Sequence, residues 1–341
     1  MFWTIFIIVF LIYTLYGIST SDMPESQSIG CFPELTDVVT VPVFTLDGAI
    51  ISTPGYHASS GIYYHDTTLG ALPPISIDPT KDEIEEARRV ISDPISDFPF
   101  EDDSSKAHAL TLSLQPFVQQ MIAGPTPVYS VNAPAPGTGK TLLAQVMGHS
   151  FIGGDIQLCA PCSTEDEWRK RLMSILMPQP SYVLFDNIQQ RLSSPALAAV
   201  LTSTEYTDRM LGENEMVTVR VNCAWAVTGN DLSFSDELHR RAVWIRMDAG
   251  PDPSKRSGWK YPDLMGWVRD HRRELVHAAL TLIQAWVAAG KPKWSDIDPD
   301  ANLMGSFEAW SNVMGGILHI AGVPGFLNSS VPAIDLEKER W

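Results

Sequence analysis

The sequence predicts an α/β fold in which a mostly parallel β-sheet lies between helices. From about residue 126 onward, apolar runs that are typical of buried strands alternate with helical patterns. This alternation is typical of a parallel sheet that is covered on both faces. The first apolar run, residues 128–131, leads through a turn rich in proline and glycine into a helical pattern that follows Thr141. We therefore expect residues 126–250 to form the core of the chain.

The turn after the first strand has the residues of a phosphate-binding loop. Residues 133–141 read Ala-Pro-Ala-Pro-Gly-Thr-Gly-Lys-Thr. In such a loop the backbone N–H groups and the helix N-terminus face the phosphates of a nucleoside triphosphate. Lys140 is placed to reach the β- and γ-phosphates, and the Thr141 hydroxyl is placed to ligate Mg²⁺. One departure from G-x-x-x-x-G-K-[ST] is visible, because Pro134 stands where the first glycine belongs.

A second buried run, residues 181–187, ends in Asp186 and Asn187. The carboxyl ends of parallel strands meet at one edge of a sheet, so the Asp186 carboxylate is expected beside the phosphate loop. There it can hold Mg²⁺ directly or through water. An apolar run that ends in aspartate is common by itself, but together with the loop it favours a metal site.

Two further features follow in the chain. A third buried run, residues 223–228, ends in Gly229 and Asn230, and an amide at that place can bind the γ-phosphate or orient the attacking water. Arg240 and Arg241 then precede another apolar run. Adjacent arginines are usually a solvated turn, but at this position they are also candidates for fingers that reach the ATP of a neighbouring subunit.

Composition narrows the class of protein. The 341 residues are 45% hydrophobic, which is ample for a buried core. The net charge of −16 argues against a surface that coats DNA generally. Residues 1–125 hold 4 Lys/Arg and 16 Asp/Glu, so most of the acidity lies in front of the core. Cys159 and Cys162 form a single C-x-x-C, which favours ordinary thiols over a zinc or redox site.

The first 20 residues form a hydrophobic segment. Residues 2–18 carry no charge and span roughly 25 Å as a helix, near the short limit for crossing a bilayer. This segment is either a membrane anchor, a buried segment, or an artefact of where the reading frame starts. An anchored ATPase would need its remaining chain in the cytoplasm, where ATP is available.

The sequence outside the core divides into three parts. Residues 21–78 are expected to be a linker and a small β module, with a hairpin signal at Asp47-Gly48. Residues 79–125 are a helical lead-in that begins with a capping box from Thr80 to Glu83. Residues 251–341 are expected to form a C-terminal helical region.

The order of these features resembles that of the AAA+ ATPases, and within them the viral and plasmid replicative helicases of superfamily three. More narrowly, residues 32–328 look like the C-terminal part of phage-type primase–helicase proteins. The stretches that carry the resemblance are Thr53-Pro54-Gly55-Tyr56, Asp97-Phe98-Pro99-Phe100, Ala135-Pro136-Gly137-Thr138-Gly139-Lys140-Thr141, Asp208-Arg209-Met210-Leu211-Gly212, Thr228-Gly229-Asn230, Arg240-Arg241, Pro262-Asp263-Leu264 and Ala321-Gly322-Val323-Pro324-Gly325-Phe326.

The resemblance implies an AAA+-type P-loop NTPase core that binds ATP and Mg²⁺. It implies a homo-oligomeric ring, a hexamer, that hydrolyses ATP and moves on single-stranded or forked DNA. Arg209 is either a further inter-subunit contact or part of a surface salt bridge. The site residues it implies are Pro136, Gly137, Thr138, Gly139, Lys140, Thr141 and Leu142 for nucleotide binding, Thr141 and Asp186 for metal, and Lys140, Asp186, Asn187, Asn230, Arg240 and Arg241 for catalysis.

The sequence departs from the family pattern in three places. Pro134 replaces a loop glycine. Asn187 replaces the glutamate with which many AAA+ enzymes polarise water, and Glu205 and Glu213 are candidate substitutes for it. About 30 residues precede the β module, so we do not expect priming activity.

Two other functions fit the sequence. One is a membrane-tethered AAA+ remodelling ATPase, although the H-E-x-x-H of membrane AAA+ proteases is absent. The other is a nucleotide-binding remnant with little turnover, which Pro134 and Asn187 favour. Stimulation of ATP hydrolysis by single-stranded DNA separates the DNA motor from both.

Overall fold

A computed structural model describes residues 35–66, 68–209 and 215–328 of the chain. Its centre is a sheet of five parallel strands in the order β12-β6-β11-β8-β7. The predicted α/β fold class is therefore confirmed. The five strands are β6 (Val128–Ala133), β7 (Leu158–Cys159), β8 (Tyr182–Ile188), β11 (Ala224–Asn230) and β12 (Ala242–Arg246).

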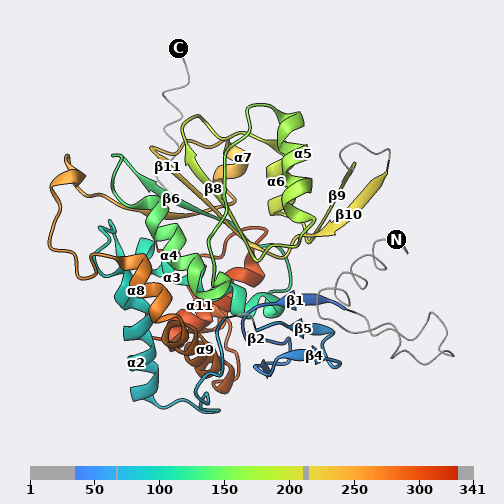
Figure 1. Cartoon of the computed structure of the whole chain (residues 1–341), viewed down its shortest axis with the longest axis vertical. Helices are drawn as coiled ribbons and strands as arrows, with labels where there is room; N and C mark the ends of the chain where they lie inside the picture. Colours follow the sequence, from blue (N-terminus) through green and yellow to red (C-terminus); the bar gives the residue numbers. More distant parts are fainter. Residues whose placement is uncertain (1–34, 67, 210–214, 329–341) are drawn as a thin grey trace.

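Helices cover both faces of this sheet (Figure 1). Alternate residues of a strand point to opposite faces, and β11 shows this directly. Ala224 and Ala226 belong to the core cluster on one face, whereas Trp225 and Val227 belong to the cluster on the other. The first face carries α3 (Asp103–Val118), α4 (Lys140–Ile152), α9 (Arg272–Ala288) and α11 (Glu308–Ile320), and the second carries α5 (Glu165–Leu176), α6 (Pro195–Leu201) and α7 (Asp236–His239).

A small β module precedes the core. Its β1 pairs with β5 in parallel, and β4 pairs with β5 in the antiparallel sense. β2 and β3 form the hairpin predicted around Asp47-Gly48, and Gly48 has the positive φ of +97° that the turn requires. The strands are β1 (Asp37–Val39), β2 (Val43–Phe44), β3 (Ile50–Ile51), β4 (Gly55–His57) and β5 (Ile62–Tyr64).

The lead-in helices pack with the C-terminal helices. α2 (Lys81–Ser92) begins with the predicted capping box, in which Thr80 and Glu83 bond each other's backbone N–H groups. It packs along α9 in the lower part of Figure 1. The shorter elements here are η2 (Asp93–Ile95), η3 (Gln119–Met121), η4 (Pro253–Lys255), α8 (Leu264–Asp270) and α10 (Trp294–Ile297).

A buried polar network joins three of these parts under the first core strand. The Tyr129 hydroxyl of β6 donates to Gln115 Oε1 of α3 over 2.8 Å, and Trp310 Nε1 of α11 donates to the same oxygen over 3.0 Å. All three side chains are buried, so each polar group needs its partner. The lead-in, the core and the C-terminal helices thus share one interior.

Two features of the fold were not predicted from the sequence. An antiparallel hairpin, β9 (Glu205–Arg209) and β10 (Met216–Arg220), follows β8 and precedes β11 in the sequence, and it projects from the core beside α5 and α6 (Figure 1). In the C-terminal helical region, α8 and α9 follow one another and are separated by a break at His271. At this break the Arg272 guanidinium lies against Gly153 and donates to Ser150 O, which caps the C-terminus of α4.

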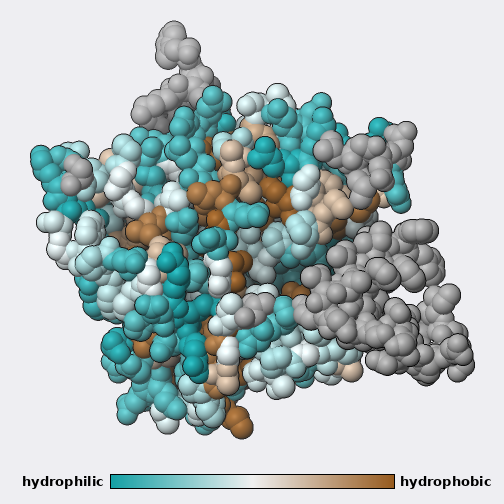
Figure 2. Space-filling model, in the orientation of Figure 1, coloured by the Kyte–Doolittle hydropathy of each residue, from teal (hydrophilic) through white to brown (hydrophobic). Residues whose placement is uncertain are grey.

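The face of the molecule drawn in Figure 2 is mainly hydrophilic, with hydrophobic residues in separate patches. No helix within the described residues is both long and apolar enough to cross a membrane. Residues 2–18, for which an anchor was considered, lie outside the described residues.

Candidate nucleotide-binding site

The turn between β6 and α4 has the backbone of a phosphate loop. Gly137 and Gly139 have φ values of +78° and +95°, which glycine adopts at little cost. Gly139 is also the N-cap of α4, and no side chain caps this end of the helix. The first N–H groups of α4 and its positive dipole end are therefore free of a side-chain acceptor, which suits an anionic ligand.

Pro134 fits this loop without strain. It is exposed and has no positive φ, so glycine's extra conformational freedom is not needed at this place. The backbone needs glycine only at the two later positions, and both hold it. The departure from the motif at Pro134 therefore leaves the part of the loop nearest the helix intact.

Lys140 is held at the loop in this structure by a backbone contact. Its Nζ donates to Ala135 O over 2.9 Å, and Thr138 Oγ1 donates to the same carbonyl over 2.7 Å. Partial burial lowers the pKa of the Lys140 ammonium, while the carboxylates of Asp231 and Asp186 oppose that shift. A backbone carbonyl is a weak partner for an ammonium, so a phosphate can replace it.

Asp186 is placed against the first turn of α4, as predicted. Thr141 Oγ1 donates to Asp186 Oδ1 over 2.6 Å, and Thr228 Oγ1 of β11 donates to the same oxygen over 2.7 Å. β11 lies between β6 and β8 in the sheet, so Thr228 bridges the gap that this intervening strand creates. Hydroxyl and carboxylate oxygens thus meet beside the phosphate loop.

The oxygen atoms of Thr141 and Asp186 are the kind of ligand that Mg²⁺ prefers. Within the described ranges, no group of three or more His, Cys, Asp or Glu side chains is placed to hold a metal ion. This agrees with the usual way of binding Mg²⁺, in which one or two protein oxygens are supplemented by phosphates and water. The residues present therefore fit a metal that arrives with the nucleotide.

Asn187 and Asn230 occupy the ends of neighbouring strands. Asn187 has a φ of +59°, which asparagine tolerates better than most residues, and its backbone N–H donates to Thr228 Oγ1 over 2.9 Å. Asn230 is exposed and pairs in register with Ala133, the residue before the loop. Asn230 thus lies beside the loop, and the Asn187 backbone N–H contacts the threonine that also bonds Asp186.

Arg240 and Arg241 lie at the opposite edge of the sheet from the phosphate loop. Val128 N, at the start of β6, donates to Arg241 O over 2.9 Å, whereas the loop follows the end of β6. A six-residue strand separates these edges by roughly 20 Å. Neither arginine can therefore reach the phosphate loop of its own chain. Arg241 is tied to Glu237 by a 2.6 Å bond to its carbonyl, whereas Arg240 is exposed.

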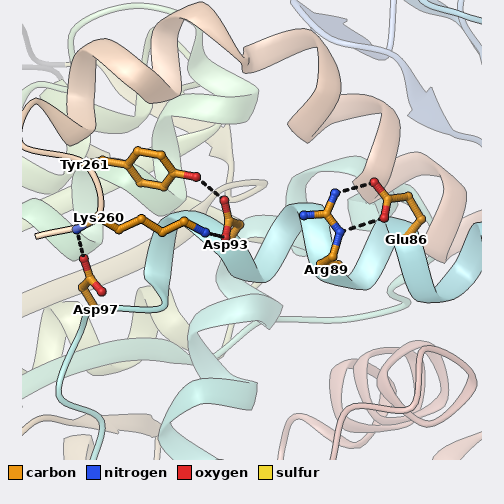
Figure 3. A network of polar contacts seen from close by, with 6 residues as sticks. All are labelled: Glu86, Arg89, Asp93, Asp97, Lys260 and Tyr261. Carbon is orange, nitrogen blue, oxygen red and sulfur yellow. Dashed lines mark hydrogen bonds and ion pairs between the residues drawn. The ribbon is translucent and has the colours of Figure 1, made fainter.

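The segment that precedes α3 packs on the phosphate loop. A Cβ added to Gly139 would lie 3.2 Å from the ring of Phe98, so this ring covers the loop closely. Figure 3 shows the contacts that fix this segment: the Lys260 and Tyr261 side chains bond Asp93, and Lys260 N donates to Asp97 over 2.7 Å. Burial opposes the charge of Asp93, but these two donors keep its pKa below its ordinary value.

The remaining predicted residues have simpler surroundings. Leu142 lies in the first turn of α4 and is 36% exposed. Pro136 is exposed in the loop, and Arg209 is exposed at the end of β9. The neighbour of Arg209, Asp208, pairs with Arg169 of α5.

Glu205 is wrongly placed to polarise water for this site. It pairs in register with Arg220, which comes four residues before β11 begins at Ala224. Glu205 therefore lies toward the edge at which the core strands start, and the phosphate loop lies at the edge where they end. The other candidate, Glu213, lies outside the described residues.

Asp231 is a site residue that the sequence analysis missed. It follows Asn230 directly, and its carboxylate attracts the Lys140 ammonium more strongly than Asp186 does. A Gly-Asn-Asp string after a buried strand could have drawn attention to it. The family motif includes only the asparagine, so it does not point to Asp231.

Solved structures similar to this chain include the NrS-1 C-terminal region, with a TM-score of 0.44, 13% identity, and coverage of 79% of this chain and 59% of that one. They also include JCV helicase with a bound inhibitor, with a TM-score of 0.31, 14% identity, and coverage of 61% of this chain and 54% of that one. A further JCV helicase structure has a TM-score of 0.27 at 14% identity.

The chain therefore spans 59% of the length of the NrS-1 structure and 54% of that of the first JCV helicase. No family model matches the chain. No curated protein matches it either. The class of fold rests on the chain's own parallel sheet and the helices that cover it, which together define an α/β core with a glycine-rich turn after its first strand.

Proposed function

We propose that this chain is an ATP-hydrolysing motor of the AAA+ kind that acts on DNA as a helicase or translocase. The observation that carries the proposal is the meeting of three groups at one sheet edge. These groups are the glycine-rich loop with Lys140, the Thr141–Asp186 pair, and the Asn230 amide. Phosphoryl transfer from ATP needs positioning and charge stabilisation more than covalent chemistry, and these groups supply both.

In the proposed reaction, the loop N–H groups and Lys140 hold the β- and γ-phosphates. Thr141 and Asp186 would hold Mg²⁺, which neutralises the charge that develops on the phosphate oxygens. Asn230 orients a water molecule for in-line attack on the γ-phosphorus. Lys140 exchanges its hydrogen bond to Ala135 O for one to the phosphate. Its positive charge then stabilises the negative charge that develops on the phosphate oxygens.

The placement of Arg240 and Arg241 supports an oligomer. An arginine that stabilises the transition state must contact the γ-phosphate, and neither of these reaches the loop of its own chain. We propose that Arg240, the more exposed of the two, reaches the ATP of the next subunit in a ring. A hexamer is the ring size that the resemblance to superfamily-three helicases implies.

Mixing two inactive variants tests this arrangement. Lys140→Ala removes the lysine of the phosphate loop. The double variant Arg240→Ala/Arg241→Ala removes the arginines that would act on the neighbouring subunit. If the arginines act between subunits, a mixture of the two variants regains part of the wild-type rate, because some interfaces pair an intact loop with an intact arginine. A mixture with no more activity than the separate variants would overturn the arrangement.

The DNA part of the proposal is tested by the rate of ATP hydrolysis with and without single-stranded DNA. We expect stimulation at low salt that is lost at high salt, because phosphate contacts release counterions. Lys140→Ala should hydrolyse ATP neither with nor without single-stranded DNA. Hydrolysis that is indifferent to DNA at every salt concentration would favour a remodelling ATPase, and ATP binding without hydrolysis would favour a nucleotide-binding remnant.

A further inference from the structure

The proposed reaction also needs a group that accepts the proton of the attacking water. Asn187 stands where many AAA+ enzymes have a glutamate, and a side-chain amide does not take up a proton at neutral pH. Glu205 lies toward the other edge of the sheet. The inference that follows rests on the proposed ATP hydrolysis.

The backbone fixes Asp231 at the mouth of the phosphate loop. Its N–H donates to Ala133 O over 3.3 Å, and Leu232 N donates to Asn132 Oδ1 over 2.8 Å. Ala133 and Asn132 are the last residues of β6, from which the loop departs. The turn that carries Asp231 is thus anchored to the strand that carries the loop, and its side chain is exposed at that edge.

The two strand ends at this edge both turn through a left-handed residue. The φ of Asp231 is +47°, and Asn187 at the end of neighbouring β8 has a φ of +59°. Aspartate and asparagine adopt this left-handed region more readily than most other residues. Between them, a Cβ on Gly229 would come within 2.6 Å of Ile188 O, so only glycine lets the two strand ends approach this closely.

Charge also places Asp231 within the site. Its carboxylate acts on the Lys140 ammonium more strongly than Asp186 does, although Asp186 is bonded to the residue next to that lysine. Coulomb attraction falls with distance, so both carboxylates lie near enough to Lys140 to act on its ammonium. Asp186 is already engaged by two hydroxyls, whereas Asp231 is exposed.

We propose that the Asp231 carboxylate is the general base that activates water for attack on the γ-phosphorus. The water oxygen forms a bond to the γ-phosphorus, and the bond from the γ-phosphorus to the β–γ bridging oxygen breaks. The electron pair of that bond leaves with ADP. The water proton passes to the Asp231 carboxylate and from there to solvent, so ATP and water yield ADP, inorganic phosphate and a proton.

Three variants of the full chain test this assignment, namely Asp231→Asn, Asp231→Ala and the control Glu205→Gln. For Asp231→Asn we expect the turnover rate to fall by roughly 10²–10⁴-fold, the usual contribution of a general base. The dissociation constant for a fluorescent ATP analogue should change by less than about threefold, or 0.7 kcal/mol. Glu205→Gln should keep the wild-type rate and affinity.

Rescue with formate gives a readout that a structural role would not produce. Removal of the carboxylate in Asp231→Ala leaves space in which formate can accept the proton, so added formate should raise its rate several-fold and leave the wild-type rate unchanged. Wild-type turnover by Asp231→Asn, or loss of ATP binding in that variant, would overturn the general-base role. Absence of both binding and turnover in the wild-type chain would instead overturn the proposed function itself.

Discussion

Two regions of the molecule differ in how their polar side chains are partnered. One is the edge of the core sheet that carries the phosphate loop, and the other is the set of contacts that attach the β module and the hairpin to the core. At the edge, Lys140 has a backbone carbonyl as its partner, and Asn230 and Asp231 are exposed. At the attachments, side chains satisfy one another: Asp37 accepts 2.8 Å bonds from Gln120 and Asn222, which fasten the β module to the core.

The hairpin is attached in the same way as the β module. Arg169 of α5 makes a two-bond contact with Asp208 of β9, at 3.0 and 2.7 Å. Arg220, at the end of β10, donates to Thr36 O of the β module over 2.8 Å. Polar groups that bond each other hold a structure together, whereas polar groups left at the mouth of a loop are available to a ligand. Substitutions at the edge should therefore change activity, and those at the attachments should change stability.

The largest effect is expected at the edge, for Asp186→Ala. In the proposed site this carboxylate is a ligand for Mg²⁺, whose charge stabilisation is worth several kcal/mol, so ATP turnover should fall by about 10²–10⁴-fold. The free energy of unfolding should stay within about 1 kcal/mol of wild type, because the Thr141 and Thr228 hydroxyls can rotate to other partners. Turnover and urea denaturation check this pair of outcomes. A large loss of stability with little loss of turnover would place Asp186 among the attachments.

The next effect is expected at the attachment of the β module, for Asn222→Ala. Asp37 would keep its burial but lose one of its side-chain donors, which costs about 1–3 kcal/mol of folding stability. The rate of ATP hydrolysis at saturating ATP should stay within about twofold of wild type. Urea denaturation and a turnover assay measure the two quantities. A strong loss of turnover in the folded variant would show that this attachment also shapes the site.

A smaller effect is expected from the pH dependence of the hairpin attachment. Hydrogen bonds from Arg169 lower the pKa of Asp208 to about 2, against about 3.9 in the unfolded chain. The stability that this contact contributes is therefore fully present above pH 4 and is lost as the pH falls from about 4 to about 2. Because Arg169 is 53% exposed, we expect on the order of 1 kcal/mol. Asp208→Asn should lose this part of the acid dependence in urea denaturation.

The smallest effect, of opposite sign, is expected for Asp37. Burial raises its pKa, and the hydrogen bonds from Val38 N and the Gln120 side chain only partly oppose this. The folded chain then binds this proton more tightly than the unfolded chain, so its contribution to stability grows as the pH falls through the raised pKa. Wild type measured against Asp37→Asn should gain relative stability as the pH falls toward 4. A relative loss would show that Asp37 is held as a charged group.

Much of the core followed from the sequence because the central strands are short apolar runs that lead into turns or polar residues. The strands that end at Ala133, Ile188 and Asn230 lie side by side in one sheet, with the loop and Asp186 at one edge. The capping box at Thr80 and the hairpin around Gly48 also formed as predicted. The capping box and the hairpin turn depend only on residues that are close in the sequence, which explains why they could be predicted.

Features that depend on tertiary contacts could not be predicted from the sequence. The β9–β10 hairpin reverses the chain between two core strands, so Glu205 lies toward the far edge despite its position between Asp186 and Asn230 in the sequence. The break at His271 coincides with a contact of Arg272 with the end of α4, more than 100 residues away. The nearness of Asp231 to Lys140 comes from the register of β11 beside β6.

The central claim is that the carboxyl edge of the core sheet hydrolyses ATP. The most direct measurement is the release of inorganic phosphate from saturating Mg·ATP by the full chain, compared with that by Lys140→Ala. We predict steady multiple turnover by the wild-type chain and a rate at the level of the buffer for the variant. Equal rates for the two chains, whether both active or both inactive, would contradict the claim.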